Sequence, residues 1–199
     1  TETDQEAGAV QSAYQIYQLI GTNWMTKKIN GIPIIERLDT ALNYVMHNRM
    51  DKNYGLLTGA HTADWGDVDI VDSDEQAVYT DDRTHWTSDI YDQSMFFQAC
   101  IELAEMWNAL GMKQYAEKWI HTAHSIQSAT NKWLWNENNG FYRVHIHLDN
   151  LTHDFDEDNL FAMGGNTQAI LSGLSQKDKI KRIIDTALER QKTFGISTI

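Results

Sequence analysis

The sequence predicts an all-α fold in which antiparallel helical hairpins alternate between two concentric layers, the arrangement of an α/α toroid. Apolar residues recur at helical spacing over six segments, and a single proline, Pro33, interrupts the chain. The segments also differ in pattern, since some carry one apolar stripe and others carry two. About three hairpins are expected within one incomplete domain over 1–199, with a short β-hairpin near 140–148. A plain helical bundle is the alternative.

The apolar patterns assign the expected helices to the two layers. The segments 113–134 and 176–192 each have one stripe, as outer helices with one wet face do. The segment 89–110 has two stripes, and 158–171 is apolar or glycine on nearly all sides, which predicts inner helices. The full set of expected helices is 5–20, 34–50, 89–110, 113–134, 158–171 and 176–192. The first of these fits the inner layer less clearly.

The connections between these helices differ in length. Those that follow inner helices are short, at 111–112 and 172–175, whereas those that precede inner helices are long, at 51–88 and 135–157. Because the helices of a hairpin run antiparallel, both long connections are expected at the end where inner helices begin. Long loops in a compact domain are usually functional. The sequence therefore predicts a site formed by these two connections.

The composition excludes several classes of function. Sixteen Lys and Arg residues against 28 Asp and Glu residues give a net charge of −12, which argues against nucleic acid or an anionic membrane as the partner. No apolar stretch approaches the roughly 20 residues that span a bilayer. Cys100 lies in an apolar helical run, so we expect a small buried hydrophobe rather than a nucleophile. The first residues are polar and acidic and show no signal peptide, so the compartment stays open.

The first long connection contains carboxylates beside an indole. Asp64, Trp65 and Asp67 lie within four residues, and burial beside indole and other carboxylates raises the pKa of a carboxyl group. Glycoside hydrolysis needs such a protonated acid and a second carboxylate. An exposed acidic loop is the alternative, and a Ca²⁺ loop is a further one. The acidic residues of 67–75 lack the glycine and the final glutamate of an EF-hand.

The remaining candidates lie in the later parts of the two connections. Trp86 offers a stacking surface, and Asp89 is either a hydroxyl acceptor or a helix N-cap, with the cap favoured. His153, Asp154 and Glu157 are candidates for binding sugar hydroxyls, although acidic residues there also suit a helix N-terminus.

Three histidines, His145, His147 and His153, suggest a zinc site. His145 and His147 alternate on an extended segment, but no Cys or HExxH pattern accompanies them. Rim histidines that contact hydroxyls are favoured instead. No metal and no cofactor are therefore expected.

Short motifs in this region resemble those of a known enzyme superfamily. Tyr-Gly-Leu-Leu at 54–57 followed by Asp-Trp-Gly-Asp at 64–67 resembles the acid loop of six-hairpin glycosidases, which include amylo-1,6-glucosidase, α-rhamnosidase-like and cellobiose-phosphorylase-like proteins. Leu-Trp-Asn at 134–136 and Gly-Phe-Tyr at 140–142 are similar to a hairpin of the same superfamily. The resemblance covers about 51–175. It implies that Asp67 is the general acid, with Asp64 as its rival, and that Trp65 is a wall of the sugar site.

These observations together predict an inverting glycoside hydrolase that acts on an oligosaccharide or polysaccharide. The expected catalytic residues are Asp67 and Asp64. The expected sugar-contacting residues are Tyr54, His61, Trp65, Trp86, Asp89, His153, Asp154 and Glu157.

Alternatives remain open. A sugar epimerase on the same scaffold would depend on His61 or His85. A polysaccharide lyase on that scaffold is another alternative. Outside the enzymes, a helical module could bind carbohydrate without catalysis. A full toroid has six hairpins, so we expect a fragment without the catalytic base. Such a fragment is either inactive alone or completes its ring as a homo-oligomer.

Overall fold

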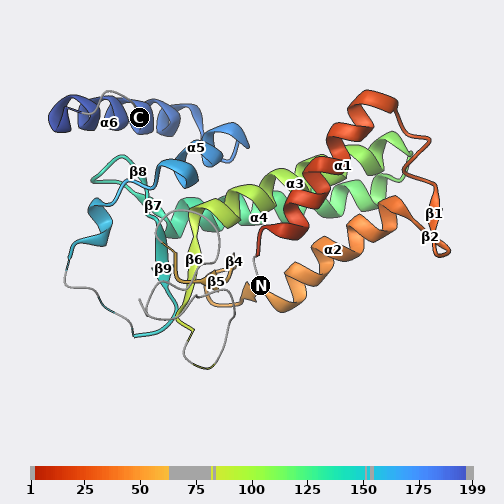
Figure 1. The fold of residues 1–199 in the computed structure, drawn as a ribbon, viewed down its shortest axis with the longest axis horizontal. Coiled ribbons are helices and arrows are strands. Elements are labelled where there is room, and N and C mark those ends of the chain that lie inside the picture. The colour runs from red at the N-terminus through yellow and green to blue at the C-terminus, as the bar shows by residue number, and fades with distance from the viewer. Residues whose placement is uncertain (1–2, 63–81, 83, 151, 153–154, 196–199) are drawn as a thin grey trace.

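The computed structural model describes residues 3–62, 82, 84–150, 152 and 155–195, and it is mostly helical (Figure 1). The α-helices of this part are α1 (Gln5–Ile20), α2 (Ile34–Asn48), α3 (Ile90–Ala109), α4 (Lys113–Trp133), α5 (Met163–Leu171) and α6 (Lys177–Phe194). The prediction of a mostly helical fold is thereby confirmed. Apolar residues spaced at three and four positions give each helix a face to bury. None of the described helices is long and apolar enough to cross a membrane.

Helix α3 is the centre of the helical part. It packs against α1 on one side and α5 on the other, and it forms an antiparallel hairpin with α4 (Figure 1). Its buried side chains face all directions, as the two apolar stripes predicted. They include Cys100, whose thiol is fully buried; burial raises the pKa of Cys100 well above its ordinary value. The expectation of a small buried hydrophobe at Cys100 is confirmed.

Helices α2 and α4 both pack against α3. The buried face of α4 follows one stripe through Ala116, Trp119, Ala123 and Ile126. A polar contact joins this stripe to α2 inside the core: the indole Nε1 atoms of Trp119 and Trp107 donate to Asp39 Oδ1 at 2.6 and 3.3 Å. Both tryptophans are almost fully buried. Asp39 therefore ties three helices together through donors that have no access to water.

Helix α5 begins later than the sequence predicts. The expected helix 158–171 is replaced by a 3₁₀ turn, η1 (Glu157–Asn159), followed by extended backbone at Leu160 and Ala162 and then by α5. Asp156 explains the break, since its side chain accepts hydrogen bonds from Asp158 N and from Asn159 Nδ2. Short polar side chains that bond the local backbone in this way compete with the continuing helix.

Short strands lie between the helices. Their bounds are β1 (Lys28–Ile29), β2 (Ile32–Pro33), β3 (Met50–Asp51), β4 (Leu56–Leu57), β5 (Gly59–Ala60), β6 (Trp86–Asp89), β7 (Trp135–Asn136), β8 (Phe141–Tyr142) and β9 (His145–His147). All pairings are antiparallel: β1 with β2, β3 with β4, β7 with β8, and β5-β6-β9 as one three-stranded sheet.

The expected β-hairpin at 140–148 is only partly correct. The segment is extended, but it does not pair with itself. Its first part, β8, turns back onto β7, with Gly140 at the corner in the left-handed region (φ 75°). Its second part, β9, joins β6 from the first connection instead. Alternation of apolar residues predicts extended backbone but does not identify the partner strand.

The hairpins that follow α2 and α4 have the same construction at an offset of 85 residues, from Asp51 to Asn136 and from Gly55 to Gly140. In the first, Asp51 Oδ1 accepts from the backbone N–H groups of the residues two and three positions later. Asn136 Oδ1 does the same in the second. Each glycine has a positive φ and donates its N–H to the backbone oxygen of that acidic or amide residue. The chain thus repeats a unit of helix, β-hairpin and helix.

Each hairpin is held by a buried amide on the α-helix that follows it. Gln93 of α3 accepts from Leu57 N at 2.8 Å and donates to Leu57 O at 3.0 Å. Asn166 of α5 accepts from Tyr142 N at 2.9 Å and donates to Tyr142 O at 3.0 Å. Leu57 and Tyr142 are equivalent under the same offset. These two amides complete the backbone hydrogen bonding of strands that would otherwise be unpaired in the core.

Replacing Gln93 with leucine is expected to lower the free energy of unfolding by about 2 kcal/mol, because it leaves a buried N–H and a buried C=O of Leu57 without partners. Urea unfolding followed by circular dichroism measures the change. Gln114→Leu is the matched control, since Gln114 is exposed on α4. An equal loss in both variants would contradict the role given to Gln93.

The buried Glu102 predicts a dependence of stability on pH. Burial raises the pKa of Glu102, with the hydrogen bond from Gln98 opposing and the charge of Glu105 adding to the shift. A carboxyl whose pKa is raised on folding disfavours the folded state once it must ionise there. The folded protein should therefore lose stability as pH rises through and above the ordinary glutamate range.

Glu102→Gln should remove this loss, because the amide oxygen can still accept from Gln98 Nε2. We expect the variant to melt above the wild type at pH 8 and the difference to shrink toward pH 4. Thermal unfolding across this range checks the sign. A difference that grows toward acidic pH would show that the carboxylate is stabilised by folding.

Candidate functional site

The two long connections meet in the three-stranded sheet β5-β6-β9 at the N-terminal end of α3. In its register Asp89 lies opposite His145, and Thr87 lies opposite His147. Side chains alternate along a strand, so these four point to the same face of the sheet. His61 extends the pairing of β5 by one step, since its N–H donates to His85 O at 2.8 Å. Gly59, two residues earlier, is opposite Thr87, which places His61 on the same face.

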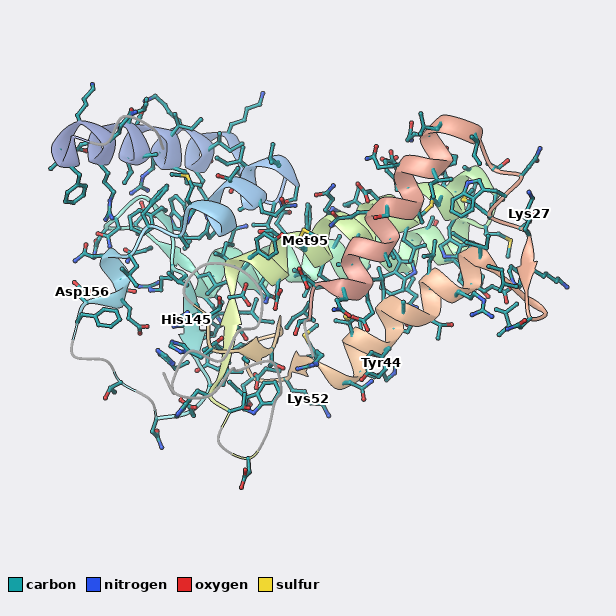
Figure 2. The ribbon with its side chains drawn as sticks, viewed as in Figure 1. Lys27, Tyr44, Lys52, Met95, His145 and Asp156 are labelled. Atoms are coloured by element: carbon teal, nitrogen blue, oxygen red, sulfur yellow. The ribbon has the colours of Figure 1, made fainter. Side chains whose placement is uncertain are left out.

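Three histidines and one glutamate converge on this face. We call His61, His145, His147 and Glu157 the His–Glu cluster. Glu157 belongs to η1 in the second connection, and its carboxylate oxygens lie 3.1 Å from His145 Nε2, 2.8 Å from His147 Nε2 and 3.9 Å from His61 Nε2. The ring centroids of the histidines are 4.8 to 5.4 Å apart. Figure 2 shows His145 among the strands, on the side of the molecule where η1 and Asp156 lie.

The cluster is mostly buried, and two of its members are partly exposed. His61 and His145 are exposed by only 2% and 8%, whereas the side chains of His147 and Glu157 are exposed by 17% and 24%. Burial lowers the pKa of His145, although the Glu157 charge opposes the shift. His145 therefore favours the neutral imidazole, the form with a lone pair available to a metal or a proton. In the described part of the chain, this is the one group of histidine, cysteine and acidic side chains close enough to share an ion.

A pair formed by a histidine and an aspartate lies just before β6. His85 Nδ1 is 2.7 Å from Asp149 Oδ2, and both side chains are about one-third exposed. A carboxylate at one ring nitrogen fixes the orientation of the imidazole and leaves the other nitrogen for chemistry. The pair again joins the first connection to the second.

Trp86 lies on the opposite face of the sheet from the His–Glu cluster, because it precedes Thr87 by one residue and pairs with Ala60. The Arg49 guanidinium lies 5.5 Å from its ring centroid. A pocket of about 390 Å³ is lined there by Tyr44, Asn48, Arg49, Thr58 and Trp86. Trp86 and His61, expected to contact the same sugar, therefore face two different sides of β6.

Two other expected sugar contacts have structural roles. Tyr54 packs edge-on against Trp133 of α4, with ring centroids 5.0 Å apart, at the corner of the β3–β4 hairpin. Asp89 is fully buried, and its Oδ1 accepts from Asp92 N at 2.8 Å at the start of α3. The N-cap interpretation of Asp89 is confirmed. The expected residues Asp64, Trp65, Asp67, His153 and Asp154 lie outside the described residues.

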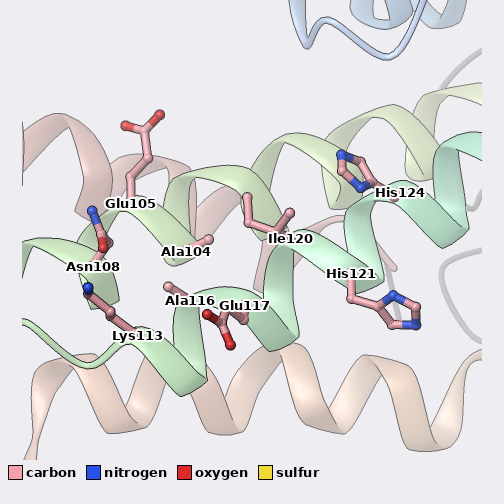
Figure 3. Close-up of a pocket in the computed structure, with 9 residues that line it drawn as sticks. All are labelled: Ala104, Glu105, Asn108, Lys113, Ala116, Glu117, Ile120, His121 and His124. Atoms are coloured by element: carbon pink, nitrogen blue, oxygen red, sulfur yellow. The ribbon is translucent and has the colours of Figure 1, made fainter.

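A larger groove lies on the helices between α3 and α4 (Figure 3). It has a volume of about 560 Å³, and its lining residues are Ala104, Glu105, Asn108, Lys113, Ala116, Glu117, Ile120, His121 and His124. His121 and His124 are exposed on α4, and Glu117 is exposed as well. Solvated charges of this kind are typical of a helix surface, so the groove is a weaker candidate than the His–Glu cluster despite its size.

The sequence paired His145 with His147 and placed His61 and Glu157 among the sugar contacts, but it did not bring all four together. Two histidines spaced by two on an extended segment were visible at 145 and 147. Their partner His61 is more than 80 residues away and reaches them only because β5 and β9 flank the same strand, β6. Such non-local pairing leaves no local mark in the sequence.

Comparisons with known proteins give no assignment. No protein-family model matches the chain, and no curated protein matches it significantly. Function is therefore inferred from the geometry and from the motifs of the sequence.

Proposed function

We propose that this chain is part of a carbohydrate-processing enzyme, a glycoside hydrolase, whose site is formed by the two long connections. One observation carries the proposal. His61, where the first connection leaves β5, lies within 3.9 Å of Glu157, near the end of the second connection. Loops that are far apart in sequence but share one end of a helical scaffold are the usual place for an active site.

The repeated hairpins support a toroid as the scaffold. A unit of helix, β-hairpin and helix recurs with the same turn geometry and the same amide contact. A plain bundle does not need such recurrence, whereas repeat architectures are built from it. Apolar side chains also remain exposed on α1 and on α5 and α6, where additional hairpins of a ring would pack. They are Ile16, Leu19, Ile20, Leu171, Ile184, Leu188 and Phe194.

The chemistry rests on the residues that follow His61. Asp64, Trp65 and Asp67 lie three to six positions after it. In the proposed reaction Asp67 donates a proton to the leaving glycosidic oxygen, and a second carboxylate activates the attacking water. The indole and the neighbouring carboxylates would keep Asp67 protonated near neutral pH. The resemblance to six-hairpin glycosidases assigns the same role to Asp67.

The Trp86 pocket supports carbohydrate as the ligand class. It combines the aromatic side chains of Trp86 and Tyr44 with the amide of Asn48. Aromatic faces bind the apolar faces of sugar rings, and amides bind hydroxyl groups. The pocket lies at the same end of the molecule as the His–Glu cluster, on the other side of β6. It would serve as a flanking subsite rather than as the catalytic one.

A sugar epimerase is the second candidate, and the pair of His85 and Asp149 favours it. An imidazole oriented by a carboxylate at 2.7 Å is suited to moving a proton at a carbon centre. In that case His85 would act as the base, and no glycosidic bond would break.

Product analysis separates these functions. Because the proposal takes this chain as part of a larger enzyme, the full-length protein is incubated with a panel of aryl glycosides and oligosaccharides, and its products are resolved by chromatography and NMR. Hydrolysis releases a reducing sugar and the free alcohol. Epimerisation changes a stereocentre without cleavage, and a lyase produces an unsaturated sugar. The hydrolase proposal expects the first result. Cleavage-free isomerisation, or binding without turnover across the panel, would contradict it.

A further inference from the structure

We propose that the His–Glu cluster binds one divalent transition-metal ion, with Zn²⁺ as the expected ion. His61, His145 and His147 would each supply an imidazole nitrogen, and Glu157 would supply a carboxylate oxygen. The proposal goes beyond glycoside hydrolysis and does not depend on it, because metal binding can be measured whether or not the chain turns over a sugar.

The donor set fits this class of ion. Imidazole suits zinc, copper, iron and nickel, and three histidines with one carboxylate give the four ligands of a closed zinc site. Ca²⁺ and Mg²⁺ prefer sites made of oxygen atoms only. The chemistry of His61, His145 and His147 therefore selects a transition metal over the common hard cations.

The distances are close to those of a zinc site. With bonds of about 2.0–2.1 Å in tetrahedral geometry, neighbouring donor atoms lie about 3.3 Å apart. Glu157 Oε1 lies 3.1 Å from His145 Nε2 and 3.9 Å from His61 Nε2, on either side of this value, and Glu157 Oε2 lies 2.8 Å from His147 Nε2. All four donors lie within 4.8 Å of one another. Small side-chain rotations would bring them to a common centre.

The backbone holds the ligands before an ion binds. His145 and His147 are fixed by the ladder between β9 and β6, and the N–H of His61 continues the ladder between β5 and β6. Next to Glu157, Asp158 accepts from the Arg143 guanidinium at 2.6 and 3.2 Å, which anchors η1 to the sheet. A rigid frame reduces the ordering cost of binding. An ion at the cluster would fasten both long connections to the same sheet.

A hydrogen-bonded cluster without metal is the competing explanation, since Glu157 can accept from protonated nitrogens of His145 and His147. Metal content distinguishes the two. Protein without an affinity tag is stripped with a chelator and dialysed. Zn²⁺ is then titrated by calorimetry in the presence of a competing chelator. We expect one equivalent to bind with a submicromolar Kd, and Co²⁺ to give the visible absorption of a tetrahedral site.

Two conservative variants test the ligands. His147→Gln and Glu157→Gln replace partly exposed members of the cluster, and circular dichroism verifies that they fold. Each should weaken Zn²⁺ binding by about 100-fold or more, since the loss even of a supporting partner costs 10- to 100-fold. The matched control is His121→Gln with His124→Gln, which removes two exposed histidines from α4 and should leave the affinity unchanged.

Three results would overturn the proposal: no binding by the folded wild type, unaltered binding in both cluster variants, or an equal loss in the α4 control. Measured hydrolysis without metal binding would refute the ion and leave the hydrolase intact. Metal binding without hydrolysis by the full-length protein would support the ion and contradict the hydrolase.

Discussion

Asp67→Asn is expected to lower the rate of glycoside cleavage by about 10²- to 10⁴-fold, the usual contribution of a general acid. The amide keeps the shape of the side chain but cannot donate a carboxylic proton to the leaving oxygen. The measurement is kcat and kcat/KM on the best substrate of the panel. An aryl glycoside with a highly acidic phenol as leaving group should recover much of the lost rate, because such a group departs without protonation.

Three comparisons make the test specific to Asp67. Asp82→Asn changes an exposed acid of the same connection and should leave the rate near the wild type. A loss in Asp64→Asn with little change in Asp67→Asn would move the acid role to Asp64. A greater loss in His85→Ala than in either variant would favour the epimerase.

Asp39→Ala is expected to lower the free energy of unfolding by about 4 kcal/mol. The change leaves the buried indole N–H groups of Trp107 and Trp119 without an acceptor and removes the side-chain acceptor of Asn43, which keeps its bond to the backbone oxygen of residue 39. Buried donors left without partners cost about 1–3 kcal/mol each. For a chain of this size the melting temperature should fall by roughly 10 °C, which differential scanning calorimetry measures.

Two variants serve as controls for Asp39. Asp39→Asn keeps an oxygen acceptor, so it should recover more than half of the unfolding free energy that Asp39→Ala loses. Asp185→Ala breaks an exposed pair with Lys181 on α6 and should change stability by less than about 1 kcal/mol. A loss in Asp39→Ala no larger than in Asp185→Ala would mean that the indole contacts contribute nothing.

Local signals in the sequence predicted the helices well. The stripe through Trp119, Ala123 and Ile126 and the double stripe around Cys100 identified one helix with a single buried face and one helix buried on several sides, because burial repeats with the helical period. The cap at Asp89 was likewise recognisable, since a short acidic side chain before an apolar run is the usual start of a helix. These features depend only on residues close together in the chain.

Features that depend on distant residues were missed. The sequence did not indicate that β9 pairs with β6, so His61 and His145 were never considered together. It also grouped Trp86 with His61, although strand alternation separates them. The late start of α5 arises from a competition between Asp156 and the helix that composition does not resolve. For the two strand pairings, the deciding contacts join residues whose proximity only the folded chain creates, whereas the α5 start depends on a local contact that helix periodicity does not reveal.

The central claim is that the two long connections share one end of the helical scaffold and converge at His61 and Glu157. Crystals grown with Zn²⁺, with anomalous diffraction recorded at the zinc edge, test it most directly. We expect one strong anomalous peak within bonding distance of the three histidines and Glu157. Electron density that separates His61 from Glu157, with no metal between them, would contradict both the shared site and the metal.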